Sequence, residues 1–179
     1  MVEPVARNAG GGPVASPASL ARAIALLLPL ALLGGALGSQ YIGDLHPCEM
    51  CYWQRWPHGA AILFALLAFT NPALSPRSRN FTLAAALAIA ISGIIGVYHA
   101  GVEARIFQGF TTCTALSGGG STADLLNQIT HAPLIRCDQV QWSFLGISMA
   151  GWNAILSLGG AAIILGLVRK GMAHRGMKA

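Results

Sequence analysis

Four cysteines form the most informative chemical pattern in this 179-residue sequence: Cys48, Cys51, Cys113 and Cys137. Cys48 and Cys51 are three residues apart, so in a helical turn their thiols come within reach of a disulfide. A ring that tight is typical of a redox-active pair. Pro47 precedes the pair, and a helix that begins here would favour the thiolate, which is the reactive form of cysteine.

The second pair of cysteines has a much wider spacing. Cys113 and Cys137 enclose about 25 residues, and closing such a loop is worth roughly 3.5 kcal/mol in the chain-entropy model, so a bond there could serve structure alone. Two other interpretations of Cys48 and Cys51 remain open at this point. The pair could form a purely structural disulfide, or it could bind zinc in a site completed by histidine. The histidines in question are His46, His58 and His131. Covalent haem attachment is excluded, because Tyr52 stands where that motif requires histidine.

The composition places these cysteines in a membrane protein. Hydrophobic residues make up 54% of the chain and charged residues 9%, whereas about a quarter of an ordinary soluble domain is charged. Four apolar stretches are long enough, or nearly so, for the roughly 20 helical residues that cross a bilayer core. We therefore expect an all-α membrane protein, a four-transmembrane-helix bundle. Its predicted spans are residues 23–42, 57–74, 81–101 and 144–168.

The basic residues orient the predicted bundle. Eight of the 11 Lys and Arg residues flank one side of the spans and three fall on the other, so the positive-inside rule makes the first side cytoplasmic. Both termini and the loop 71–80 are then cytoplasmic, and residues 43–56 and 102–143 form two periplasmic loops. All four cysteines lie in these two loops, where an oxidising compartment favours disulfides. The net charge of +5 is thus a topology signal rather than a nucleic-acid-binding surface.

The segments outside the spans offer less chemistry. We expect residues 1–19 to be a disordered cytoplasmic tail, residues 20–170 to be the membrane domain and residues 171–179 to be a basic cytoplasmic tail. A cleavable signal peptide is an alternative for the first span, with an apolar core at 23–33 and a cleavage site near 36–38. Even then, both cysteine loops would stay outside.

The long periplasmic loop contains one candidate helix. Ser121 and Asp124 resemble a short capping box, and Leu125, Leu126 and Ile129 fall on one side of two helical turns. This pattern predicts a small helix that lies on the membrane surface. A merely flexible loop is the alternative interpretation.

Three motifs fall at the outer ends of the predicted spans: Pro47-Cys48-Glu49-Met50-Cys51 with Gln54-Arg55, Tyr98-His99, and Cys137 with Gln141-Trp142-Ser143-Phe144-Leu145-Gly146. In combination they resemble the disulfide bond formation protein B (DsbB) family, over about residues 41–165. The resemblance implies an enzyme of the bacterial inner membrane, a protein-disulfide:quinone oxidoreductase. It would reoxidise a periplasmic dithiol oxidase of thioredoxin type, similar to DsbA, and pass the electrons to a membrane quinone, ubiquinone or menaquinone.

The resemblance also implies roles for individual residues. Cys48 and Cys51 would form the disulfide next to the quinone, and Cys113 and Cys137 the disulfide that meets the soluble partner. Arg55 matches a basic residue that the family places beside the quinone. A guanidinium there can hydrogen-bond the negative charge that develops on the quinone oxygens. Apart from the resemblance, an interfacial arginine that snorkels to water is the alternative.

His99 and Met149 complete the expected quinone-binding residues. His99 falls near the family's polar residues at the outer end of the third span, and Met149 follows the tryptophan-led motif that enters the fourth. Without the family, a lone interfacial histidine and a methionine in an apolar helix are more often structural. No metal is expected at the site.

Two other classes of protein compete with this interpretation. A vitamin K epoxide reductase-like enzyme also joins four helices, a paired-cysteine motif and a quinone, but there the loop cysteines precede the pair, whereas here Cys48 and Cys51 come first. A membrane scaffold or transporter subunit could use its external disulfides for structure. A transport path usually carries ionisable residues, and the interiors of the four predicted spans contain no Asp, Glu, Lys or Arg.

Overall fold

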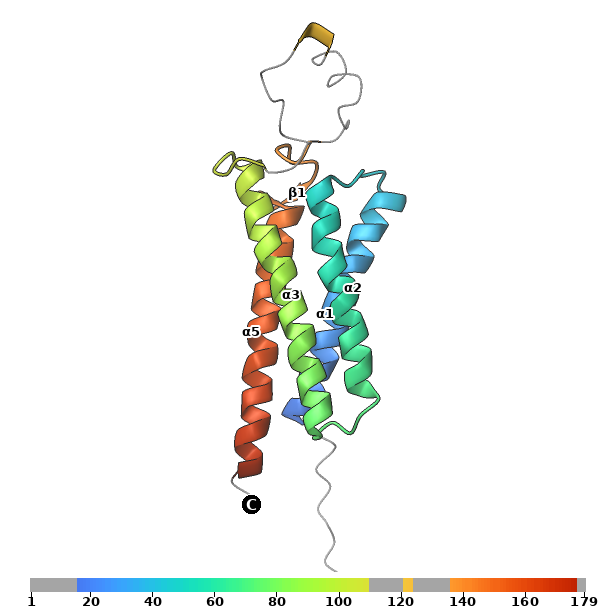
Figure 1. Ribbon diagram of the computed structural model, residues 1–179, viewed down its shortest axis with the longest axis vertical. Coiled ribbons are helices and arrows are strands. Elements are labelled where there is room, and N and C mark those ends of the chain that lie inside the picture. The colour runs from blue at the N-terminus through green and yellow to red at the C-terminus, as the bar shows by residue number, and fades with distance from the viewer. Residues whose placement is uncertain (1–15, 110–120, 124–135, 177–179) are drawn as a thin grey trace, which may run out of the picture.

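The computed structural model describes residues 16–109, 121–123 and 136–176, and within these segments the chain forms four long helices. They are α1 (Pro17–Tyr41), α2 (Glu49–Phe69), α3 (Pro76–Glu103) and α5 (Met149–Gly176). The helices run along one common long axis, and α1 begins at the same end of the bundle at which α5 ends (Figure 1). The expected all-helical bundle is therefore present.

Capping side chains decide where three of the helices begin. Ser16, Cys48 and Ser75 precede α1, α2 and α3 in extended backbone, and each side chain accepts a hydrogen bond from the backbone N–H three residues later. Pro17 and Pro76 then occupy the first helical positions of α1 and α3, where the N–H that proline lacks would have no helical partner. Both helices consequently begin before the apolar residues from which their spans were predicted.

α2 differs most from its predicted span, residues 57–74. It begins after the Cys48 cap, continues through Pro57 and ends at Phe69. By length and composition, three helices can cross a membrane, namely α1, α3 and Met149–Ala173 of α5, and α2 is not one of these. The polar residues in its first half lower its hydropathy. The fourth span therefore stays a prediction.

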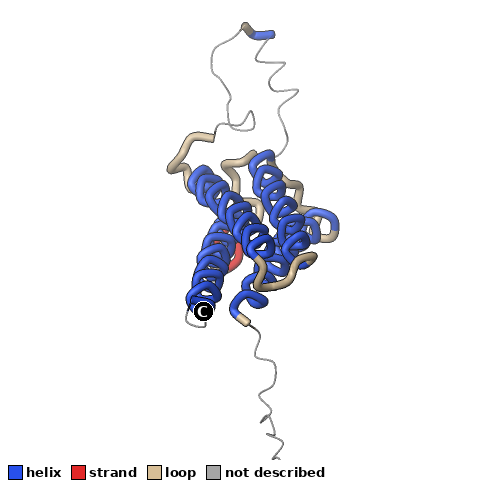
Figure 2. The backbone as a smooth tube through the Cα atoms, turned by 60° about the horizontal axis from the view of Figure 1, so that its bottom comes forward, coloured by secondary structure: helices blue, strands red, loops and turns tan. Residues whose placement is uncertain are grey.

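The entry into α5 is not helical where the sequence predicted a helix from residue 144. Ser143–Phe144 (β1) and Ile147–Ser148 (β2) pair as an antiparallel hairpin, red in Figure 2. Leu145 has φ 52° and Gly146 has φ 77°, which is the pair of left-handed residues that a two-residue type I′ turn requires. The prediction of helix for residues 144–148 is wrong, because local turn geometry overrides the apolar composition there.

Helix also extends further than expected at both ends of the described chain. Residues 17–19 form the first turn of α1 rather than part of a disordered tail, and residues 1–15 lie outside the described segments. α5 continues to Gly176, so the predicted basic tail from residue 171 begins inside this helix. The candidate surface helix of the long loop falls mostly outside the described residues, which include only 121–123 of that loop's middle.

Small side chains let the helices approach closely. The core between them is rich in fully buried alanines, among them Ala21, Ala61 and Ala85. A Cβ added at Gly96 of α3 would lie 3.0 Å from the backbone oxygen of Ala150 in α5. Close contact between backbones is the usual packing of membrane helices, where lipid removes the hydrophobic drive for association.

Candidate active site at the dithiol end of the bundle

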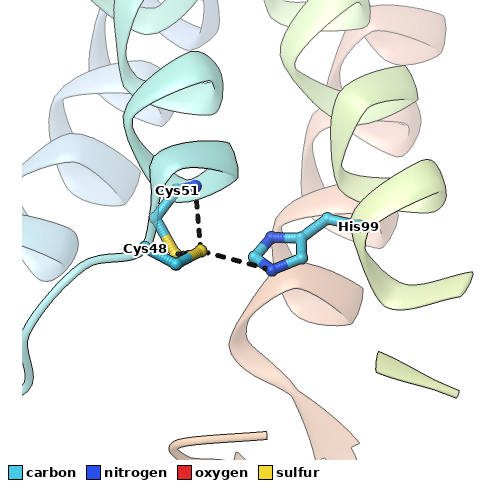
Figure 3. Close-up of side chains that lie close together, drawn as sticks. All are labelled: Cys48, Cys51 and His99. Carbon is cyan, nitrogen blue, oxygen red and sulfur yellow. Dashed lines mark hydrogen bonds between the residues drawn. The ribbon is translucent and has the colours of Figure 1, made fainter. Parts of the chain in front are cut away.

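Cys48 and Cys51 lie together at the start of α2 (Figure 3). Cys48 caps the helix and accepts a hydrogen bond from the backbone N–H of Cys51, at 3.4 Å. The two Sγ atoms lie 3.1 Å apart as reduced thiols, with Cys48 donating to Cys51. The structure therefore places the two thiols together at a helix N-terminus, as the sequence predicted.

The surroundings of the two thiols shift their pKa values in opposite directions. The pKa of Cys51 is lowered, first by the hydrogen bond from Cys48 and further by the nearby positive charge of Arg55. The pKa of Cys48 is raised, first by its hydrogen bond with Cys137, then by its hydrogen bond with Cys51 and by burial. Cys51 is thus the more acidic thiol of the pair.

Cys137 reaches this site from the far side of the long loop. It is fully buried and packs in one cluster with Cys48, Met50 and Val102. The structure therefore brings a loop cysteine into contact with the dithiol, although Cys137 is 86 positions from Cys51 in sequence. Cys113 lies outside the described residues, so its pairing with Cys137 stays a prediction.

His99 faces the dithiol from α3, across the gap between the helices (Figure 3). Its Nε2 lies 3.5 Å from the Sγ of Cys48 and 3.8 Å from the carboxylate of Glu103. Its Nδ1 lies 2.8 Å from the amide nitrogen of Gln54. Sequence reasoning selected His99 but missed Gln54 and Glu103, for which the spacing of four residues from Met50 and from His99 is the only local signal.

A cavity of about 760 Å³ opens beside the dithiol. Its wall includes Cys48, Cys51 and all three residues predicted to bind quinone, Arg55, His99 and Met149. The other lining residues come mainly from the outer half of α1, from the connection 42–47 that leads to α2, and from residues on either side of the hairpin that precedes α5. The volume lies within the range of roughly 300–1,000 Å³ that small-molecule pockets occupy.

Arg55 is held in place rather than extended into water. Its guanidinium donates to the side-chain oxygen of Gln40 and, at 3.1 Å, to the backbone oxygen of Ala36, both in α1. It also lies over the ring of Tyr52, with 5.2 Å between the guanidinium carbon and the ring centroid. Pro57 does not interrupt α2, so Cys51 and Arg55 share one helical face.

The same group of residues could also bind a soft metal ion. The ligand atoms of Cys48, Cys51 and His99 all lie within 4.8 Å of one another. These are not the histidines of the zinc interpretation, because His58 bonds to Asn153, His46 contacts a backbone oxygen, and His131 lies outside the described residues.

Comparison with known proteins decides the family. The family model described as disulfide bond formation protein DsbB matches residues 18–167. This chain belongs to the DsbB family. Disulfide bond formation protein B of Alkalilimnicola ehrlichii is 32% identical over 83% of this chain and 94% of its own length. Disulfide bond formation protein B 2 of Pseudomonas aeruginosa is 31% identical over 71% of this chain and 76% of its own.

Membership of the DsbB family fixes the general role. An uncharacterized protein of Rickettsia prowazekii, RP370, is similar as well, with 27% identity over 81% of the chain. No solved structure gives a significant match. The chain is a membrane protein of disulfide bond formation, and its dithiol site agrees with the oxidoreductase role of the DsbB family.

Proposed function

We propose that this protein is a thiol:quinone oxidoreductase that reoxidises a periplasmic dithiol oxidase similar to DsbA. The observation that carries the proposal is the placement of the Cys48–Cys51 pair on the wall of a cavity that also holds Arg55, His99 and Met149. A structural scaffold would have no need for two thiols of unequal acidity beside a cavity.

The polar groups of the cavity wall fit a quinone. Four buried side-chain atoms have no hydrogen-bond partner in the described part of the chain, and three of them belong to residues that line the cavity: Nε of Arg55, Nδ1 of His58 and Oε2 of Glu103. The rest of the wall is mostly apolar. A quinone is an apolar ring with acceptor oxygens at its edge, so one of these oxygens can accept from Nε of Arg55, whereas the acceptors on His58 and Glu103 are left for a donor. When bound, a quinone supplies the acceptor for two electrons and two protons.

The thiols then act in a fixed order. The reduced partner attacks the Cys113–Cys137 disulfide at Cys113, which releases Cys137 as a thiolate. Cys137 attacks Cys48 of the oxidised pair, and Cys51 leaves as the thiolate. The partner's second thiol then displaces Cys113 and completes the partner's own disulfide, and Cys113 attacks Cys137, which restores the loop disulfide and releases Cys48. Each exchange forms one disulfide bond and breaks one, so the electron pair passes inward without loss. The contact of Cys137 with Cys48 supports this order.

Three side chains serve the acceptor end of the site. Arg55, held by α1, presents a positive charge to the quinone oxygens and stabilises the thiolate of Cys51. His99 holds Nε2 towards Cys48 and the cavity. Met149 contributes apolar contact at the cavity wall. No step of this scheme requires a metal.

The proposed location follows from the charges. The protein lies in the bacterial inner membrane with both termini in the cytoplasm, and both cysteine loops lie in the periplasm. α1 begins and α5 ends at the same end of the bundle (Figure 1). This supports an even number of spans, which places both termini on one side of the membrane.

An anaerobic titration tests the function. The purified, fully reduced protein is mixed with increasing amounts of a short-chain ubiquinone or menaquinone, and quinol and free thiols are measured. We expect one quinol for each Cys48–Cys51 disulfide formed. A Cys51→Ala protein, which cannot close that disulfide, is the control and should yield none. If wild-type thiols persist in the presence of both quinones, the protein is not a quinone oxidoreductase.

A further inference from the structure

Four polar side chains that the proposed function does not use form a hydrogen-bond network inside the bundle. Gln54 and His58 come from α2, Ser92 from α3 and Asn153 from α5. Gln54, His58 and Ser92 are buried, at 7% exposure or less. Polar side chains among apolar membrane helices are costly unless they bond to one another, and they commonly mark function.

Two backbone carbonyls decide which way the amides of this network face. The side-chain nitrogen of Gln54 lies 3.1 Å from the oxygen of Met50, and that of Asn153 lies 3.2 Å from the oxygen of Ser92. A carbonyl oxygen only accepts, so in both cases the amide nitrogen must be the atom that faces it. The bond from the nitrogen of Asn153 to the side-chain oxygen of Gln54, at 2.8 Å, agrees with both orientations.

With the amides oriented, the hydrogen positions on both neutral imidazoles follow. Gln54 donates to Nδ1 of His99, so His99 carries its hydrogen on Nε2. The side-chain oxygen of Asn153 accepts from Ser157 at 3.0 Å and lies 2.9 Å from Nε2 of His58. His58 must therefore carry its hydrogen on Nε2 as well, and its Nδ1 is a lone-pair acceptor.

This acceptor of His58 is unsatisfied. His58 is 3% exposed, and its buried Nδ1 has no hydrogen-bond partner within the described segments. Ser92 does not supply one, because its hydroxyl lies 3.0 Å from Nε2 and donates to the backbone oxygen of Gln54. His58 also forms part of the cavity wall. A donor on a molecule in the cavity would satisfy the acceptor.

We propose that His58 is a further ligand-binding residue, which selects the reduced form of the electron acceptor by accepting a hydrogen bond from a quinol hydroxyl. The inference rests on the proposed function. A quinone has carbonyl oxygens at the same positions, and these cannot donate to Nδ1, so this acceptor distinguishes the two redox forms. Asn153 is a positioning residue, because it holds the hydrogen of His58 on Nε2. Binding moves no electron and no proton.

Equilibrium binding tests the proposal without turnover. In a full-length Cys51→Ser protein no Cys48–Cys51 disulfide can form, so neither redox form of the probe is converted. The probes are decylubiquinone and decylubiquinol, with short-chain menaquinone and menaquinol in parallel. His58→Leu should weaken quinol binding by about 2- to 10-fold, the effect of one neutral hydrogen bond, and leave quinone binding unchanged. Ser157→Ala, which removes only the other donor to Asn153, is the matched control and should change neither.

A second measurement avoids any substitution of His58. In ¹⁵N-histidine-labelled protein, quinol should shift the Nδ1 resonance of His58 towards a hydrogen-bonded value, and quinone should leave it unchanged. Asn153→Leu should abolish this difference, because the hydrogen of His58 is then no longer held on Nε2.

The outcomes separate this proposal from the function on which it rests. Equal effects of His58→Leu on both redox forms, or an Nδ1 resonance that ignores quinol, would overturn the role of His58 and leave the proposed function intact. If no quinone or quinol binds even with His58 present, the proposed function fails.

Discussion

Cys48 donates its thiol hydrogen to Cys51 across 3.1 Å at the first turn of α2. The bond makes two identical side chains unequal, because the donor keeps its hydrogen while the acceptor is stabilised as thiolate. Cys48, the inner partner of this bond, is also the thiol that contacts Cys137. One cysteine thus faces Cys137 of the long loop, and the other, the more acidic thiol, lies near the positive charge of Arg55.

Alkylation of the reduced protein should follow this inequality. Because the pKa of Cys51 is lowered and that of Cys48 raised, Cys51 becomes thiolate first as pH rises and should react with iodoacetamide at lower pH than Cys48. Mass spectrometry of each modified peptide measures both profiles. Cys48→Ala removes the hydrogen bond and should move the Cys51 profile to higher pH. Preferential modification of Cys48 would contradict the assignment.

All four cysteines should lie on the periplasmic side of the membrane, since the basic residues place both loops outside. After mild reduction of intact cells, a membrane-impermeant thiol reagent should modify the partly exposed Cys51 first, and the buried Cys48 and Cys137 more slowly. Peptide mapping identifies the modified residues. Protection of all four until the cells are lysed would reverse the orientation.

Replacing Cys137 should trap the partner. In Cys137→Ala, Cys113 is a free thiol, so it should displace the leaving group from a thioredoxin-fold oxidase whose reactive cysteine carries an activated mixed disulfide, and the resulting adduct should persist because Cys137 is not there to resolve it. The reactive cysteine of the oxidase is first converted to an activated disulfide with thionitrobenzoate. The disulfide-linked adduct is then detected on a non-reducing gel. Cys113→Ala/Cys137→Ala is the control and should form none. An adduct on Cys48 instead would show that the loop pair is bypassed.

Substitution of Arg55 should weaken quinone use more than folding. Arg55→Ala should reduce apparent quinone affinity by about 10- to 100-fold, as expected for a lost charge-assisted hydrogen bond, and Arg55→Lys should reduce it less. Thiol exchange with the partner is followed separately. Gln40→Ala removes one of the bonds that tie Arg55 to α1 while keeping the charge, so it controls for helix packing. Unchanged quinone kinetics in Arg55→Ala would show that Arg55 does not contact the quinone and is only an arginine at the membrane interface.

A methyl group at Gly96 should destabilise the bundle. The added Cβ would lie 3.0 Å from the oxygen of Ala150 and 3.1 Å from the nitrogen of Ala154, and the backbone of α5 cannot yield as a side chain can. We expect Gly96→Ala to cost about 1–3 kcal/mol, observed as a lower Tm in detergent. Gly59→Ala is the matched control, since an added Cβ there meets nothing within 4 Å. Because alanine has a higher helix propensity than glycine, Gly59→Ala should leave the stability of the bundle unchanged or raise it.

Chemistry and general architecture could be predicted from the sequence because their signals are local. The spacing of Cys48 and Cys51 is contained in one helical turn, and the apolar stretches identify helices without reference to one another. The DsbB resemblance rests on short motifs of the same kind, and the family match confirms it. Boundaries were less predictable, because the caps at Ser16 and Ser75 and the turn at Leu145 act independently of hydropathy.

Contacts between helices were decided only by the tertiary structure. Gln54 and Asn153 are 99 positions apart; Gln54 stood in a motif but was given no role, and Asn153 was not singled out at all. Folding brings them to 2.8 Å and thereby fixes the hydrogens of His58 and His99. Cys137 and Cys48, 89 positions apart, are likewise brought together only in the folded chain. Sequence spacing specifies what each residue can do, whereas hydrogen-bond direction depends on which partners the packed helices bring together.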